Sequence, residues 1–239
     1  MDASITLPVV RPVSRLRLAL VTSASVSAIL YTLRGIGEIL AWPFGILAAL
    51  VHEMGHGVAG LLAGGTFERL QVWPNGAGVT EVEGLGRFGV AIMAAGGLVG
   101  PAIAAAIGFF LARTPRGARG FLIVCGMALL LAEMLVVRGL FSLIFAGALA
   151  ILCLAFGFFG SPNVRQWAVV FLSVQLALNL LTEASYLFMD ELSIPEGTFP
   201  SDTGLMAQAL VLPYWFWGIA CGVISLGVLA QGVRTYWGK

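Results

Sequence analysis

Long apolar stretches dominate this sequence and set the strongest limit on its fold. They run over residues 18–34, 37–64, 88–112, 120–137, 139–159, 166–188 and 211–232. A helix needs about 20 mostly apolar residues to cross the hydrocarbon core of a membrane, and lipid does not tolerate unpaired backbone polar groups. We therefore predict an all-α polytopic membrane protein with six or seven transmembrane helices.

The charged residues are too few to cover the surface of a soluble domain of this length. Of the 239 residues, 59% are hydrophobic and 10% are charged, whereas about a quarter of the residues in a soluble domain carry charge. We interpret residues 1–239 as a single integral-membrane domain. The net charge of +1 gives no indication of a nucleic-acid partner.

The first apolar stretch is the weakest candidate for a transmembrane helix, because it is short and holds several hydroxyl residues between 22 and 27. Arginines precede this stretch, and three more occupy the loop at 113–119. Seven spans would place these two basic segments on opposite sides of the membrane, whereas the positive-inside rule expects both in the cytoplasm. Either the count of spans is one too high or the first stretch does not fully cross.

Two segments interrupt the apolar pattern. Residues 66–86 contain P-N-G-A-G between short runs that favour β-structure, which predicts a β-hairpin with its turn at Asn75-Gly76. Residues 189–207 are polar and hold several acidic side chains.

The segment V-H-E-M-G-H-G at 51–57 contains the only two histidines of the chain. On a helix, positions i and i+4 share a face, so His52 and His56 can bind one metal ion while the adjacent Glu53 acts as a general base. The competing interpretation is a pair of hydrogen-bonded core histidines, but ionisable groups inside a membrane span are costly and usually functional. Gly55 and Gly57 leave two interpretations open, close helix packing or room for a substrate.

A catalytic zinc ion takes three protein ligands, so one ligand is missing from this motif. The chain has no third histidine, which leaves a carboxylate or, less readily, a cysteine. Asp202, in P-S-D-T-G ahead of the last apolar stretch, is the preferred candidate, and Asp190 and Glu183 are alternatives. Ser201 or Asp202 can also simply cap a helix.

Four segments in this order carry a family resemblance. They are V-H-E-M-G-H-G at 51–57, G-G-T-F-E-R-L-Q-V-W-P-N-G-A-G-V-T at 64–80, A-A-G-G-L-V-G-P-A-I at 94–103 and S-D-T-G-L-M-A-Q-A-L-V-L-P-Y-W-F-W at 201–217. Together they resemble the site-2-protease-like intramembrane zinc metallopeptidases, in particular their smaller bacterial relatives. The best-studied members carry an aspartate in an L-D-G motif, which is absent here.

The resemblance implies that His52, His56 and Asp202, or Asp190 in its place, bind one Zn²⁺ ion, and that Glu53 is the catalytic base. The catalytic core would cover about 37–232. The enzyme would be a zinc metalloendopeptidase that cleaves a transmembrane or membrane-associated polypeptide within the bilayer.

The location implied by the resemblance is the bacterial cytoplasmic membrane. The substrate would have to unwind before attack, and the hairpin at 66–83 can bind the unwound strand through backbone pairing. We assign these substrate contacts to Leu70, Val72, Asn75 and Gly76; a hairpin that merely covers the site is the alternative. The chain outside the spans is too short for a regulatory domain, so a separate regulatory protein is a possible further partner.

Two other functions compete with proteolysis. One is a metal-binding membrane scaffold or sensor without hydrolytic activity, in which Glu53 would have no use. The other is an ion transporter that uses the histidines and nearby acidic residues as a path. A transporter of this kind would show internal symmetry, and the sequence contains no internal repeat.

Overall fold

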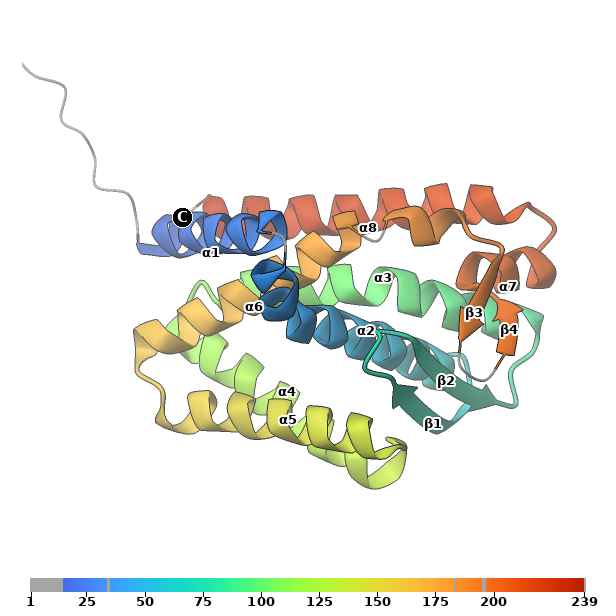
Figure 1. Ribbon diagram of the computed structural model, residues 1–239, viewed down its shortest axis with the longest axis horizontal. Helices are drawn as coiled ribbons and strands as arrows, with labels where there is room; N and C mark the ends of the chain where they lie inside the picture. The colour runs from blue at the N-terminus through green and yellow to red at the C-terminus, as the bar shows by residue number, and fades with distance from the viewer. Residues whose placement is uncertain (1–14, 34, 183, 195–196, 239) are drawn as a thin grey trace, which may run out of the picture.

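The computed structural model of the protein describes residues 15–33, 35–182, 184–194 and 197–238, which form a helical bundle with two small hairpins at one end (Figure 1). In chain order the elements are α1 (Arg15–Thr32), α2 (Ile36–Leu62), β1 (Thr66–Val72), β2 (Gly78–Glu83), α3 (Arg87–Leu111), α4 (Pro115–Leu135), α5 (Leu140–Phe159), α6 (Pro162–Thr182), η1 (Ala184–Phe188), β3 (Glu191–Ile194), β4 (Gly197–Pro200), α7 (Asp202–Ala209) and α8 (Tyr214–Trp237).

Six of the described helices, α2 to α6 and α8, are long and apolar enough to cross a membrane. Helix α1 is apolar but shorter and is not among them. The prediction of an all-α polytopic membrane protein with a hairpin after the histidine helix is therefore confirmed. Of the predicted six or seven spans, the described residues contain six.

The predicted span at 166–188 is divided in the structure. Helix α6 ends at Thr182, and the 3-10 helix η1 follows as a separate element. The polar segment at 189–207, for which no regular structure was predicted, forms the antiparallel pair β3–β4 and the start of α7. Helix α8 begins directly after Pro213, whose ring favours the position that precedes or opens a helix.

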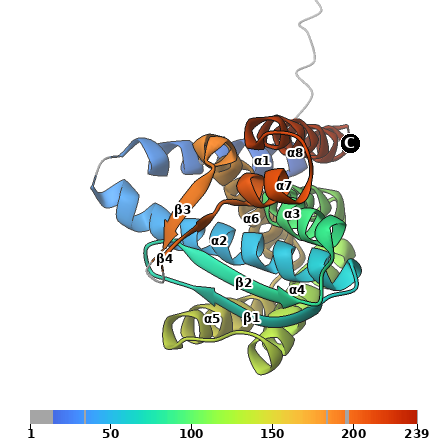
Figure 2. The ribbon, with the colours of Figure 1, turned by 90° about the vertical axis from the view of Figure 1, so that its right-hand side faces the viewer.

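Helix α2 lies at the centre of the bundle. Figure 2 shows it between the hairpin β1–β2 with α4 and α5 on one side and α3, α7 and α8 on the other. Helices α2 and α3 approach closely because glycines meet where they cross: a Cβ on Gly55 would overlap the carbonyl oxygen of Gly96. On another side of α2, a Cβ on Gly57 would overlap the ring of Phe67 in β1. Of the two interpretations of Gly55 and Gly57, these contacts support close packing.

The hairpin β1–β2 turns at Asn75-Gly76, as predicted. Gly76 has a φ of 86°, which suits glycine, and its N–H donates to the carbonyl of Trp73 at 3.0 Å. The turn lies against α2, where the indole N–H of Trp42 donates to the carbonyl of Pro74 at 2.7 Å.

The outer edge of β1 is already paired. Leu70 donates to the carbonyl of Val136 at 2.9 Å and accepts from Arg138 at 2.8 Å. Next to this pair, the hydroxyl of the buried Ser142 accepts from the N–H of Val72 at 2.8 Å and donates to its carbonyl at 2.9 Å. These contacts fix the hairpin to the link between α4 and α5 and to the first turn of α5. Among the described strands, β2 pairs with β1 alone, so its other edge has no strand partner.

Replacing Ser142 with alanine tests this attachment. The substitution leaves the buried N–H and C=O of Val72 without their partner, and we expect a loss of about 1–3 kcal/mol in the free energy of unfolding. Thermal unfolding of the purified protein in detergent measures the change. Ser25→Ala, at an exposed position of α1, is the control and should unfold as the wild type does; equal stability of the two variants would contradict the attachment.

Candidate metal centre

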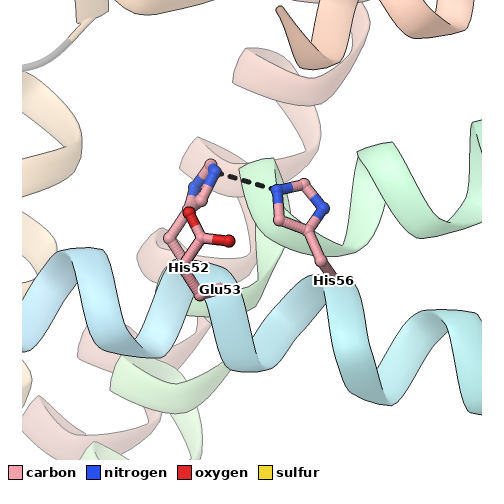
Figure 3. A group of neighbouring side chains, drawn as sticks. All are labelled: His52, Glu53 and His56. Carbon is pink, nitrogen blue, oxygen red and sulfur yellow. Dashed lines mark hydrogen bonds between the residues drawn. The ribbon is translucent and has the colours of Figure 1, made fainter. Parts of the chain in front are cut away.

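Helix α2 presents His52, Glu53 and His56 from one region of its surface toward the same space (Figure 3). The spacing of the motif accounts for this, since residues four apart lie one above the other on a helix. The Nε2 atoms of His52 and His56 are 3.0 Å apart, and one ligand atom from each of the three side chains lies within 4.8 Å of the others. Glu53 and His56 are buried.

Asp202 completes the arrangement from a distant part of the chain. Its Oδ2 lies 3.0 Å from Nε2 of His52, and its Oδ1 lies 3.2 Å from Nε2 of His56. Two ligands of a tetrahedral zinc ion, each about 2.0–2.1 Å from the metal, are about 3.3 Å apart. The two nitrogens and the carboxylate therefore form a donor set of the right size and chemistry for one divalent metal ion.

Helix α7 positions Asp202 through its N-terminal cap. The hydroxyl of Ser201 accepts from the N–H of Gly204 at 3.1 Å and also donates to the carbonyl of Met189. Ser201 is thus the capping residue, which leaves the side chain of Asp202 free to face the histidines.

Asp190 has a different position from Asp202. It is exposed, it does not line the cavity at the histidines, and its carbonyl accepts from the N–H of Ser201 at 2.8 Å. Through this backbone contact Asp190 supports the start of α7. Glu183, the third carboxylate considered, lies outside the described residues.

Two neighbours orient the candidate ligands. The Nδ1 atom of His56 lies 2.8 Å from the carbonyl of Met93 on α3. A carbonyl only accepts, so Nδ1 carries the hydrogen and Nε2 of the neutral ring keeps its lone pair toward Asp202 and His52. On the other side, the hydroxyl of Tyr186 in η1 donates to Oδ2 of Asp202 at 3.2 Å.

The charge of this site favours an ionised aspartate beside a protonated tyrosine. Burial by itself would raise the pKa of Asp202, but the imidazoles of His56 and His52 lower it below its ordinary value. Burial, reinforced by the carboxylates of Asp202 and Glu53, raises the pKa of Tyr186. The phenol therefore keeps the hydrogen that it donates to Asp202.

Strand β2 contacts both the backbone and the side chain of Glu53. The hydroxyl of Thr80 donates to the backbone carbonyl of Glu53 at 3.0 Å, and a Cβ on Gly78 would overlap the Glu53 carboxylate. The absence of a side chain at residue 78 thus leaves the space that this carboxylate occupies beside the histidines.

A cavity of about 720 Å³ opens at these residues. His52, Glu53, His56, Asp202 and Tyr186 line it together with the hairpin turn, including Asn75 and Gly76. The other two predicted substrate-binding residues are elsewhere: Leu70 and Val72 are 0% and 2% exposed and pack in the interior against α4 and α5.

Several contributors to the site escaped the sequence analysis, among them Gly78 and Thr80 of β2 and three more residues. Tyr186 lies near the end of the apolar stretch at 166–188, a position where aromatic residues are common in membrane proteins. Met93 contributes only its backbone carbonyl, which any residue would supply. Gly97 belongs to the quoted segment at 94–103, but its role became visible only in the structure: a Cβ at this position would overlap the imidazole of His56.

Gly97→Ala tests the space reserved for His56. We expect the displaced imidazole to weaken metal binding and to lower any metal-dependent activity by about a hundredfold, the effect of a misplacement of roughly 1 Å. Metal content after purification and activity measure the change. Gly120→Ala, on α4 where no atom lies within 4 Å of the added Cβ, should behave as the wild type does. Unchanged metal content in Gly97→Ala would contradict the packing.

Gly78→Ala tests the space reserved for Glu53 in the same way. The three atoms nearest to the added methyl group all belong to Glu53, so we expect full metal content with activity reduced by about a hundredfold. Loss of metal in this variant would show that Glu53 itself holds the ion.

The chain was also compared with known proteins. The Peptidase M50B-like family profile matches residues 22–232, which include His52, Glu53, His56 and Asp202. No curated protein and no solved structure matches the chain. Because the profile covers most of the sequence, the chain belongs to the Peptidase M50B-like family, the site-2-protease-like membrane metallopeptidases that its motifs resemble.

Proposed function

We propose that this protein is an intramembrane zinc endopeptidase that cleaves a membrane-embedded or membrane-adjacent polypeptide. The observation that carries the proposal is the meeting of two imidazole nitrogens and one carboxylate, with a second carboxylate beside them, in a cavity among membrane-spanning helices. Such a set suits a catalytic zinc site, which keeps one coordination position open for water or substrate.

His52, His56 and Asp202 are the proposed zinc ligands. Asp202 has an oxygen within 3.2 Å of each Nε2 atom, whereas Asp190 is exposed and does not line the cavity. Two histidines with one carboxylate form a donor set that zinc enzymes use for hydrolysis. The hydrogen bonds from His56 to Met93 and from Tyr186 to Asp202 fix the orientation of two of these ligands.

Glu53 is the proposed general base. When bound, zinc supplies a Lewis acid that polarises the scissile carbonyl and makes water acidic enough to lose a proton near neutral pH. The Glu53 carboxylate accepts the proton of the attacking water, and the same group then donates it to the amine nitrogen of the departing strand. Gly78 and Thr80 hold Glu53 at the edge of the cavity.

The free edge of β2 is the proposed docking strand for the substrate. A transmembrane helix hides its carbonyls in internal hydrogen bonds, so the cleaved segment must first be extended. An extended peptide can pair with an exposed strand edge, and among the described strands β2 pairs with β1 alone. Because β1 is paired on both edges, Leu70 and Val72 drop out of the proposed contacts, while Asn75 and Gly76 remain at the cavity wall.

The position of Glu53 favours proteolysis over a metal-binding scaffold. A closed structural site holds its metal with four protein ligands and needs no base. Here a buried carboxylate lies within 4.8 Å of the two histidine ligands, and the cavity reaches all three side chains.

Three substitutions test the proposal together. Glu53→Gln should retain stoichiometric zinc but lower proteolysis of a membrane-inserted peptide by at least about 10²–10⁴-fold, the usual contribution of a general base. Asp202→Asn should weaken zinc binding by more than about a hundredfold, because even residues that only support a ligand cost 10–100-fold. Asp190→Asn, the same change in an exposed neighbour, is the matched control and should retain zinc and activity.

Zinc analysis of the purified proteins and a cleavage assay in detergent or proteoliposomes supply both readouts. Proteolysis that survives Glu53→Gln would exclude Glu53 as the general base, whereas a wild-type protein that holds zinc and cleaves no peptide would favour a scaffold. Zinc binding that is retained in Asp202→Asn but lost in Asp190→Asn would identify Asp190 as the third ligand.

A further inference from the structure

One tyrosine hydroxyl reaches the metal centre from a distant part of the chain. Tyr186 lies in the short 3-10 helix η1, between α6 and β3. It lines the cavity together with the histidines, and its hydroxyl donates to Oδ2 of Asp202 at 3.2 Å. Its ring lies edge-on to the ring of His52, with 5.7 Å between the ring centres. The phenol hydroxyl is therefore one hydrogen bond away from a proposed zinc ligand, on the wall of the cavity.

The packing of η1 holds this tyrosine in place. Tyr186 is half-buried and packs against an apolar cluster formed by α3, α7 and α8. A Cβ on Gly218 of α8 would overlap the carbonyl oxygen of Leu187, so the backbone of η1 lies directly on α8. Three residues after the tyrosine, the carbonyl of Met189 accepts from the hydroxyls of the two residues that flank Asp202. These contacts fix the tyrosine and the aspartate relative to each other.

Other side-chain donors line the cavity as well, but their hydrogen bonds lie away from the proposed ligands. The indole N–H of Trp42 donates to a carbonyl of the hairpin turn, and the hydroxyl of Thr80 donates to a backbone carbonyl of α2. Among the described contacts, neither Asn75 nor Asn179 has a hydrogen bond to a proposed ligand. Tyr186 differs from all four, because its acceptor is a carboxylate of the metal centre itself.

We propose that Tyr186 is a catalytic residue, which donates a hydrogen bond to the oxyanion of the tetrahedral intermediate. This role rests on the proposed function. As the water oxygen bonds to the scissile carbonyl carbon, the π-electron pair of the C=O bond moves onto the carbonyl oxygen, and one water proton passes to Glu53. Collapse of the intermediate re-forms the C=O bond and breaks the C–N bond, and the proton passes from Glu53 to the leaving nitrogen. Tyr186 keeps its own hydrogen throughout.

The phenol is suited to serve two acceptors in turn. Its hydrogen turns about the C–O bond, so donation passes from Asp202 to the oxyanion without movement of the ring. Burial and the neighbouring carboxylates raise the pKa of Tyr186, which keeps this hydrogen on the oxygen. A donor that the fold has already positioned requires no reorganisation when the charge develops. The bond to Asp202 thus holds the hydroxyl ready before the substrate carbonyl is attacked.

Tyr186→Phe removes only the hydroxyl and tests this role. With zinc at saturation, we expect kcat for a membrane-inserted reporter peptide to fall about 10²–10³-fold, the usual effect of removing one oxyanion donor, while KM stays within about twofold. Tyr214→Phe, at a half-buried position of α8 that does not line the cavity, is the matched control and should keep the wild-type kcat. Thermal unfolding of the zinc-loaded proteins verifies that both variants are folded.

Binding of a phosphinic analogue of the reporter peptide gives a readout without turnover. A tetrahedral phosphinate and a methylene replace the scissile carbonyl and N–H, so a negatively charged oxygen stands in for the oxyanion. At saturating zinc, Tyr186→Phe should bind this analogue about 10²–10³-fold more weakly than the wild type does. The affinity for the unaltered peptide, measured with and without Tyr186→Phe in a Glu53→Gln background, should not change.

A tyrosine that only orients Asp202 would give a different result. Tyr186→Phe would then bind zinc about 10–100-fold more weakly, and saturating zinc would restore both kcat and analogue binding. Such a restoration, or an unchanged kcat, would overturn the catalytic role and leave the proposed peptidase standing. A zinc-loaded wild-type protein that cleaves no reporter would instead overturn the proposed function, and the role of Tyr186 would fall with it.

Discussion

The approach of the Asp202 carboxylate to the two imidazoles of α2 is the interaction on which the rest of the structure depends. A buried negative charge between membrane-spanning helices is costly unless a positive charge compensates it. Imidazoles offset that charge only while they are protonated, whereas a divalent cation held by all three groups would offset it with both rings neutral. The same requirement accounts for the elements around the site: the cap by Ser201, the carbonyl of Met93 and the hydroxyl of Tyr186 each orient a proposed ligand or the helix that carries it.

Glycines give this site its space. Gly97 leaves room for the His56 ring and Gly78 for the Glu53 carboxylate, while Gly55 and Gly96 bring α2 and α3 into backbone contact. A side chain at any of these positions would overlap a functional group or the neighbouring helix. The close helix packing and the open cavity thus have a common origin, because small residues bring the backbones together beside the functional side chains.

The part of the site that depends on local spacing could be predicted from the sequence. His52, Glu53 and His56 lie within one turn and a half of helix, so their shared face follows from the helical repeat. The hairpin was predictable as well, since Asn75-Gly76 suits a tight turn between two β-prone runs. Asp202 could be named only as a candidate, because nothing local indicates which distant carboxylate meets the histidines.

The remaining features require the three-dimensional arrangement. Strands β3 and β4 and the eight-residue helix α7 lie in a polar segment without a clear periodicity, and their packing determines their structure. The burial of Leu70 and Val72 depends on residues 136–142, a segment far along the chain that pairs with β1. The roles of Tyr186 and Gly97 become visible only through the side chains that they contact.

The coordination of zinc in the purified protein is the most direct test of the central claim, that His52, His56 and Asp202 meet to hold a catalytic metal. X-ray absorption at the zinc edge measures the ligand types and distances. The account predicts two imidazole ligands together with oxygen ligands, all at about 2.0–2.2 Å. A sulfur ligand at about 2.3 Å, which would come from a cysteine, or a single imidazole would contradict it.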